Sequence, residues 1–168
     1  NHRMKVAREA IDSGLYETLQ FPFCYLASEE EVELVRLCQE KDLGFIAMKG
    51  LSGGLLNNAE ACYAFMRQYP NVVPIWGIQH EWELDQWLEL SRRDPAMTPE
   101  LQAVIEHDRS ELAGNFCRSC GYCLPCTAEI DIPQAARMSA LLRRSPYQPY
   151  MSDEWHEKMH RIEECVHC

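Results

Sequence analysis

The sequence predicts an α/β fold with parallel strands, followed by a helical segment that is rich in cysteine. Three observations support this prediction. Short apolar segments begin at residues 16, 44 and 72, so successive strands start 28 residues apart. Helical patterns separate these strands, as they do in βαβ units. Six of the nine cysteines lie in the last 52 residues, from Cys117 onward.

The chain begins with a predicted helix over residues 3–13, because apolar side chains recur there at helical spacing. Gly14 follows this helix as a natural C-cap. A strand is expected over residues 16–21, which are rich in strand formers and are followed by Pro22.

Ser28 and Glu31 have the spacing of a capping box, which predicts the start of the second helix. Residues 44–48 are almost entirely apolar, which is typical of a strand covered on both faces. A third helix is expected around Ala61–Met66, and a third strand over residues 72–76.

A further helix is expected from about Glu81 to Leu90, burying parts of Trp82, Trp87 and Leu88. Three strands cannot close a barrel that needs eight, and an open three-stranded sheet would leave two unpaired edges. A slice of a larger α/β barrel over residues 1–95 is therefore favoured over a small doubly wound domain.

Residues 96–168 are expected to form an all-helical domain. Thr98 and Pro99 are typical of a helix start, and this helix is expected to end near residue 113. Two amphipathic helices are predicted over 133–144 and 153–164, with Ser152 as N-cap of the second.

Four cysteines occur at successive two-residue gaps, at Cys117, Cys120, Cys123 and Cys126. This spacing favours an iron–sulfur cluster, because a short loop lets neighbouring thiolates reach different irons. A zinc ribbon would separate its two pairs by roughly 15 to 20 residues. Cysteines this close together are also a poor disulfide scaffold.

Cys165 and Cys168 form a second Cys-x-x-Cys pair, and two arrangements remain open. In two-cluster ferredoxins the fourth cysteine of one run binds the other cluster, which would group Cys126 with this pair. The missing ligand of each cluster would then follow residue 168. Alternatively, Cys117, Cys120, Cys123 and Cys126 hold a single cluster.

The other cysteines and the histidines suggest no additional site. Cys24, Cys38 and Cys62 lie among apolar residues and are interpreted as core thiols. His156 and His160 are four residues apart on one predicted helix, but no third ligand completes a metal site there.

The formal net charge of -10 argues against a nucleic-acid or anionic-membrane partner, because both attract clustered Lys and Arg. No apolar segment reaches the roughly 18 residues of a membrane span, and no signal peptide is recognised. Abundant free cysteines suit a reducing cytoplasm. The chain begins at Asn1 without an initiator methionine and stops on Cys168, the second cysteine of a Cys-x-x-Cys pair, so it is expected to be an internal segment of a longer protein.

Several motifs, taken in order, resemble the second half of an aldo/keto reductase barrel, and the cysteine segment resembles the subgroup with a ferredoxin-like iron–sulfur extension. The motifs are Asn1-His2, Leu19-Gln20-Phe21-Pro22-Phe23, Ile46-Ala47-Met48-Lys49-Gly50-Leu51-Ser52-Gly53-Gly54, Pro74-Ile75-Trp76-Gly77, Cys120-Gly121-Tyr122-Cys123-Leu124-Pro125-Cys126 and Ile130-Asp131-Ile132-Pro133.

The resemblance implies the last three βα units of a (β/α)8 TIM barrel, followed by a segment that binds one or two 4Fe-4S clusters through Cys117, Cys120, Cys123, Cys126, Cys165 and Cys168. It also implies that NADPH or NADH binds at the carboxyl ends of the strands. Asn1 and Gln20 would hold the nicotinamide carboxamide, and Met48 stands where an aromatic residue usually stacks on the ring. Lys49, Leu51 and Ser52 would line the pyrophosphate.

The chain departs from the family at several positions. Gly77, Gln79 and Glu83 stand where basic residues often bind the 2′-phosphate of NADPH. Gly50 and Thr127 each replace a common proline. The family's catalytic Asp, Tyr, Lys and His belong to the first four strands, so no catalytic residue is assigned to this chain.

The implied activity is hydride transfer between a nicotinamide and a small carbonyl or alcohol by the full-length enzyme, with this segment inactive alone. A redox partner protein is a further expectation. The two alternatives are an electron-transfer module with the barrel as a scaffold, and a zinc-binding interaction domain.

Overall fold

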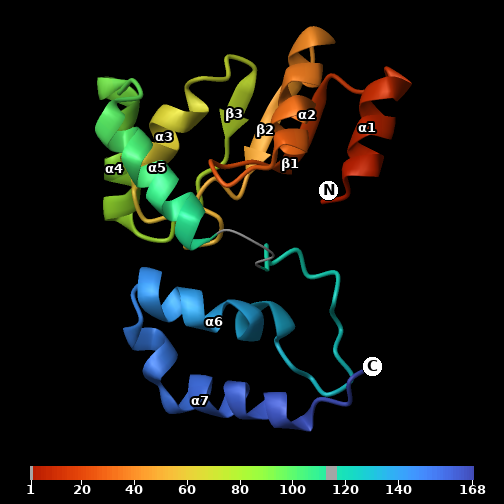
Figure 1. The fold of residues 1–168 in the computed structure, drawn as a ribbon, viewed down its shortest axis with the longest axis vertical. Coiled ribbons are helices and arrows are strands. Elements are labelled where there is room, and N and C mark those ends of the chain that lie inside the picture. Colours follow the sequence, from red (N-terminus) through yellow and green to blue (C-terminus); the bar gives the residue numbers. More distant parts are fainter. Residues whose placement is uncertain (1, 113–116) are drawn as a thin grey trace. The chain divides into compact units, whose positions relative to one another are not determined.

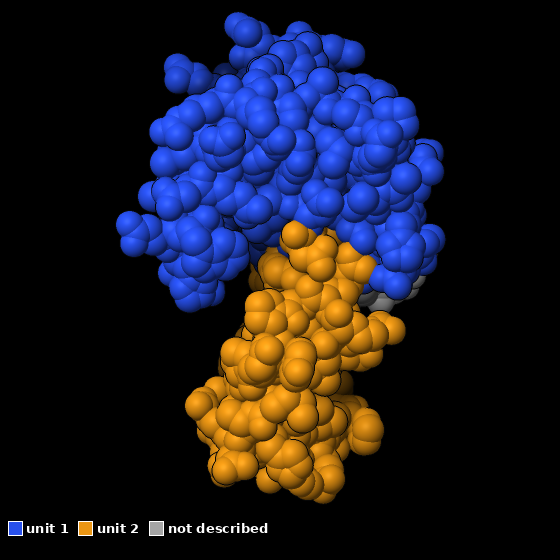
Figure 2. Space-filling model, turned by 90° about the vertical axis from the view of Figure 1, so that its left-hand side faces the viewer, with its two compact units in different colours: residues 1–52, 58–112 blue, residues 53–57, 113–168 orange. Residues whose placement is uncertain are grey.

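The computed structural model describes residues 2–112 and 117–168. It consists of two compact units, which Figure 2 shows in different colours. Unit 1 comprises residues 1–52 and 58–112, and unit 2 comprises residues 53–57 and 113–168. Within the described part of the chain, no helix is long and apolar enough to cross a lipid bilayer.

Unit 1 contains a parallel three-stranded sheet in the order β1-β2-β3, which confirms the predicted α/β class (Figure 1). The strands are β1 (Thr18–Pro22), β2 (Gly44–Met48) and β3 (Val72–Pro74). The third strand is shorter than predicted. Directly after it, Ile75 N donates to the Ala47 oxygen at 2.8 Å, and Trp76 stacks on Trp87.

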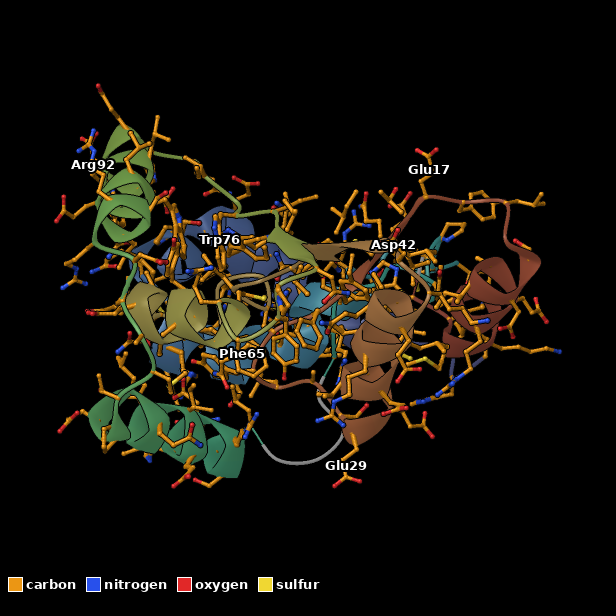
Figure 3. The ribbon with its side chains drawn as sticks, turned by 90° about the horizontal axis from the view of Figure 1, so that it is seen from above. Glu17, Glu29, Asp42, Phe65, Trp76 and Arg92 are labelled. Carbon is orange, nitrogen blue, oxygen red and sulfur yellow. The ribbon has the colours of Figure 1, made fainter. Side chains whose placement is uncertain are left out.

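Helix α1 (Met4–Ser13) precedes β1, α2 (Glu29–Glu40) connects β1 to β2, and α3 (Ala59–Met66) connects β2 to β3. Figure 3 shows α2 and α3 along one side of the sheet. The strand side chains alternate accordingly. The buried set is Leu19, Phe21, Phe45 and Ala47, and the more exposed set is Thr18, Gln20, Ile46 and Met48.

Strand β2 was expected to be covered on both faces because it is almost entirely apolar. In the structure Phe45 and Ala47 are fully buried, whereas Ile46 and Met48 are only half-buried. Two apolar side chains of this strand, Ile46 and Met48, are therefore not fully covered by the described part of the chain.

The local helix signals are confirmed. Gly14 adopts a left-handed conformation with φ of 65° and its N–H donates to the Ile11 oxygen. The capping box of α2 is reciprocal. The Glu31 carboxylate accepts from Ser28 N at 2.8 Å, and the Ser28 hydroxyl oxygen accepts from Glu31 N at 3.3 Å.

Two further helices of unit 1 are α4 (Glu81–Arg93) and α5 (Pro99–Glu111). The prediction for the buried face of α4 is wrong in part. Trp87 and Leu90 are buried, but Trp82 is 63% exposed and Leu88 is 44% exposed. The reason is that Trp87, which stacks on Trp76 with 4.0 Å between ring centroids, fixes which face of the helix turns inward.

Helix α5 belongs to unit 1, whereas the sequence places it with the cysteine-rich segment after residue 95. A buried hydrogen bond from the Tyr25 hydroxyl to the Asp108 carboxylate attaches it there. Arg109 Nε also donates to the Tyr25 carbonyl oxygen at 2.7 Å. Both contacts join residues more than 80 positions apart, which no local pattern reveals.

Unit 2 contains α6 (Ile132–Arg144), η1 (Gln148–Met151), α7 (Asp153–His160) and η2 (Arg161–Glu164). The predicted helix over 153–164 is thus α-helical only as far as His160. Asp131 caps α6 by accepting from Gln134 N at 3.3 Å. Ser152 occupies the N-cap position of α7, but its hydroxyl donates to the Pro149 oxygen at 2.9 Å instead of capping the helix.

Candidate functional site

The loop over residues 117–126 carries four of the candidate metal ligands. Cys117 and Cys126 are half-buried, and Cys120 and Cys123 are exposed. Ser119 and Gly121 have positive φ angles of 52° and 79°, so the backbone folds back tightly between the cysteines. This turn lets Ser119 N donate to Cys117 Sγ at 3.4 Å. Such N–H donors stabilise the charge of thiolate sulfur in iron–sulfur sites.

The second cysteine pair lies in the segment that follows η2. An ion pair between Arg161 and Glu129 has a nitrogen–oxygen distance of 2.5 Å. Glu129 is three residues after Cys126, and Arg161 is four residues before Cys165. The ion pair therefore links the end of the four-cysteine loop to the segment that carries Cys165 and Cys168.

All six of these thiols are free. Among the described residues, no group of three or more His, Cys, Asp or Glu side chains lies close enough together to hold a metal ion. The structure thus brings the two cysteine segments into one unit without gathering their sulfurs. The donor set itself fits an iron–sulfur cluster, because it consists of thiols, which are soft ligands.

His160 Nδ1 lies 3.4 Å from Glu163 Oε1. The rings of His156 and His160 are 4.9 Å apart and nearly perpendicular on the exposed surface of α7. His167 Nδ1 lies 3.9 Å from Cys165 Sγ.

Two of the residues that the resemblance assigns to the nicotinamide are in contact. Gln20 Nε2 donates to Met48 Sδ at 3.6 Å. The two side chains belong to neighbouring strands and point to the more exposed face of the sheet, near its carboxyl edge. Asn1 lies outside the described residues.

The residues assigned to the pyrophosphate form a turn directly after β2. Ser52 N donates to the Lys49 oxygen at 2.7 Å, and both residues have positive φ angles, 59° for Lys49 and 48° for Ser52. Lys49, Leu51 and Ser52 are half-buried. Burial lowers the pKa of His2, and the charge of Lys49 lowers it further. The positive charge of Lys49 therefore acts on the imidazole of His2, which precedes α1 in the chain.

Gly50 lies against the indole of Trp76. A Cβ at this position would be 2.6 Å from the Trp76 ring, which is closer than such atoms approach. We expect Gly50→Ala to lower the free energy of unfolding by about 1–3 kcal/mol, the usual cost of overpacking. Urea denaturation followed by tryptophan fluorescence measures this change. Gly77→Ala is the control, because a Cβ there meets nothing within 4 Å. Equal stability of the two variants would show that Trp76 moves aside.

Glu83, which the resemblance aligns with basic residues that often bind the 2′-phosphate of NADPH, caps its own helix. Its carboxylate accepts from Gln79 N at 2.6 Å and from His80 N at 2.9 Å. These two backbone bonds lower the pKa of Glu83. The group accordingly remains negative at neutral pH.

The three remaining cysteines were interpreted as core thiols. Cys38 and Cys62 are buried and Cys24 is half-buried. Burial raises the pKa of Cys38 to about 11, and it raises the pKa of Cys62 further, with smaller contributions from Cys24 and Asp108. Cys38 and Cys62 are therefore protonated, weakly nucleophilic thiols.

Sequence reasoning missed the contacts that hold residues 53–57. Arg137 Nη2 donates to the Gly53 oxygen at 2.6 Å, and Arg144 Nε donates to the Leu55 oxygen at 2.8 Å. Asn57 Nδ2 donates in turn to the Arg144 oxygen at 3.2 Å. The only local signal was the presence of arginines on a predicted amphipathic helix, which does not reveal a carbonyl partner more than 80 residues away.

Comparison with known proteins adds no relative. No model of a known protein family matches the chain, and neither the curated proteins nor the solved structures include a match.

Proposed function

We propose that this chain is the C-terminal part of an iron–sulfur oxidoreductase of the aldo/keto reductase type. The loop over residues 117–126 carries the proposal. It combines four thiols at two-residue intervals with a backbone N–H donated to Cys117 Sγ. The full-length enzyme would transfer a hydride between a nicotinamide cofactor and a carbonyl or alcohol.

Two 4Fe-4S clusters account best for the six thiols. Cys117, Cys120 and Cys123 would hold the first cluster, and Cys126, Cys165 and Cys168 the second. The ion pair between Glu129 and Arg161 supports this grouping, because it links the segments on which the second set lies. When bound, such clusters supply one-electron exchange.

A (β/α)8 barrel is the architecture we propose for the complete N-terminal domain. Within the described residues β1 and β3 pair only with β2, so the sheet has two open edges. Ile46 and Met48 are only half-buried on the face opposite the helices. Additional strands would pair with both edges, and barrel closure would cover this face.

The nicotinamide would bind at the carboxyl edge of β1 and β2. Asn1 and Gln20 would bind the carboxamide, since an amide side chain offers both a donor and an acceptor. The Met48 thioether, in contact with Gln20, would pack against the ring. Lys49, Leu51 and Ser52 would contact the pyrophosphate.

These residues bind and orient, and none acts as acid or base. When bound, the nicotinamide supplies the hydride. The negative Glu83 would repel the 2′-phosphate of NADPH, which favours NADH. The proton donor, which is a tyrosine in the aldo/keto reductases that the chain resembles, would come from the preceding part of the barrel.

An electron-transfer module is the second candidate. The exposure of Cys120 and Cys123 favours it, because a cluster near the surface is accessible to a redox partner. Nicotinamide binding distinguishes the two candidates. A Gln20→Ala variant of the full-length protein should bind NADH more weakly if the strand-end site is real, whereas a pure electron carrier would show no NADH binding in either form.

Anaerobic purification, followed by iron and sulfide analysis, tests the central claim. We expect inorganic sulfide, iron and a broad visible absorbance that dithionite bleaches. Colourless protein with stoichiometric zinc would instead support an interaction domain. Protein with neither metal would overturn the proposal.

A further inference from the structure

The turn that follows β2 has a backbone conformation that its residues seldom adopt. Lys49 and Ser52 have positive φ angles of 59° and 48°, a region that non-glycine residues rarely occupy. The Ser52 N–H donates to the Lys49 oxygen at 2.7 Å and closes the turn. Such a strained backbone persists only where the surrounding structure fixes it. The sheet fixes the entry of the turn, because Phe23 N donates to the Met48 oxygen at 3.0 Å, directly before Lys49.

The segment 53–57, on the exit side of the turn, is bound by one helix of unit 2. Arg137 Nη2, on α6, donates to the Gly53 oxygen at 2.6 Å, and Arg144 Nε donates to the Leu55 oxygen at 2.8 Å. Hydrogen bonds from a guanidinium are charge-assisted and stronger than those between neutral groups. The exit of the turn is therefore fixed by side chains that lie more than 80 residues later in the chain.

Of these two contacts, the one from Arg137 is the nearer to the turn, because Gly53 follows Ser52 directly. The Arg137 residue is 6% exposed, so its guanidinium is largely removed from water. The backbone of Gly53 also packs closely on it, since a Cβ at this position would lie 3.0 Å from both terminal nitrogens of Arg137. Breaking this hydrogen bond leaves a buried donor unsatisfied, which is costly. The Gly53 carbonyl is therefore held in one position.

We propose that Arg137 is a positioning residue for the dinucleotide, because its bond to the Gly53 oxygen fixes the exit of the turn over residues 49–52. The inference rests on the proposed function, which assigns Lys49, Leu51 and Ser52 to the pyrophosphate. A turn released at Gly53 spends less time in the binding conformation. The apparent dissociation constant then rises by the inverse of the fraction that remains competent. The peptide connection between Ser52 and Gly53 transmits the effect of α6 to the cofactor site.

Titration of NADH into the full-length protein, followed by NADH fluorescence, is the first test. If the released turn is competent about one tenth of the time, Arg137→Gln raises the Kd about tenfold. Arg137→Lys keeps a charged donor and should recover part of the affinity. Arg143→Gln is the control, because Arg143 is exposed on the same helix and its Nε donates to the Ser139 oxygen of that helix. Equal Kd values for Arg137→Gln and the wild type would overturn the inference.

Two neighbouring glycines allow a matched test from the side of the segment. Gly53 and Gly54 both have positive φ, 63° and 86°, so alanine introduces backbone strain at either position. A Cβ at Gly53 meets the Arg137 guanidinium, whereas a Cβ at Gly54 meets nothing within 4 Å. The difference between the two variants therefore measures the contact with Arg137. We expect Gly53→Ala to weaken NADH binding more than Gly54→Ala does, and equal binding by the two would contradict the proposal.

Amide hydrogen exchange measures the order of the turn without any cofactor. The Ser52 N–H, which is bonded to the Lys49 oxygen, should exchange faster in Arg137→Gln than in Arg143→Gln or the wild type. The Phe45 N–H is the internal reference, because its bond to the Asn71 oxygen at 2.8 Å belongs to the sheet region. Its unchanged exchange shows that the variant is folded. Unchanged exchange at Ser52 would refute the fixing of the turn.

These measurements separate the inference from the proposed function. If the wild type binds NADH and Gln20→Ala weakens the binding, but Arg137→Gln changes neither the Kd nor the exchange at Ser52, the cofactor site stands and the positioning role is refuted. A wild-type full-length protein that binds no NADH would refute both. A raised Kd together with faster exchange at Ser52, both partly restored in Arg137→Lys, is the expected result.

Discussion

Replacing Cys126 with serine is expected to remove about half of the bound iron, because the two-cluster grouping assigns four irons to each set of thiols. Cys165→Ser should cause the same loss, since both residues belong to the second cluster. Cys117→Ser should remove the other half. Iron and sulfide per chain, measured after anaerobic reconstitution of the full-length protein, give these values.

The double variants make the test sharper. Cys126→Ser combined with Cys165→Ser should lose no more iron than either change alone, whereas Cys117→Ser combined with Cys126→Ser should lose nearly all of it. Cys24→Ser, outside both cysteine segments, is the control and should retain full occupancy. If Cys117→Ser and Cys126→Ser each lose nearly all of the iron and Cys165→Ser keeps all of it, then a single cluster occupies the loop over 117–126.

Phe23→Ala is expected to have the largest effect on stability. Phe23 is 1% exposed, and its ring lies edge-on to Phe45 and Tyr69, with centroids 5.7 and 5.1 Å away. It also packs on Phe65 at 5.5 Å. Truncating a buried phenylalanine costs about 3–5 kcal/mol, a large fraction of the stability of an ordinary domain.

Urea denaturation measures this loss, and Tyr16→Ala supplies the comparison. Tyr16 is also aromatic and precedes β1, but it is exposed, so its removal should change the free energy of unfolding by no more than about 0.5 kcal/mol. Similar losses in both variants would mean that the aromatic cluster around Phe23 contributes little to the core.

Elements with local signals could be predicted from the sequence. The capping box at Ser28 and Glu31, the C-cap at Gly14 and the strand over 44–48 each depend on residues within a few positions of one another. The spacing of successive strands was sufficient to predict a parallel sheet. In each case, the chemistry of a few adjacent residues determines the local conformation.

Features that depend on distant partners could not be predicted. Trp76, just after β3, stacks on Trp87 of α4, and α5 is attached to unit 1 by the hydrogen bond between Tyr25 and Asp108. Neither pair leaves a periodic trace in the sequence. The candidate site also has a part that local spacing predicts and a part that depends on distant residues. Cysteine spacing identified the thiols, but the contact between Gln20 and Met48 depends on strand register.

Because unit 2 includes five residues that are bounded on both sides by unit 1, no single cut in the chain separates the two units. Ending the protein at residue 112 would delete the partners of the Gly53 and Leu55 carbonyls. Leu55 and Leu56 are both buried, so the truncated protein would keep an apolar loop whose backbone carbonyls have lost their hydrogen-bond donors. Truncation at residue 112 would therefore disturb the N-terminal part that it was meant to isolate. Point substitutions on α6 are the better way to test these contacts.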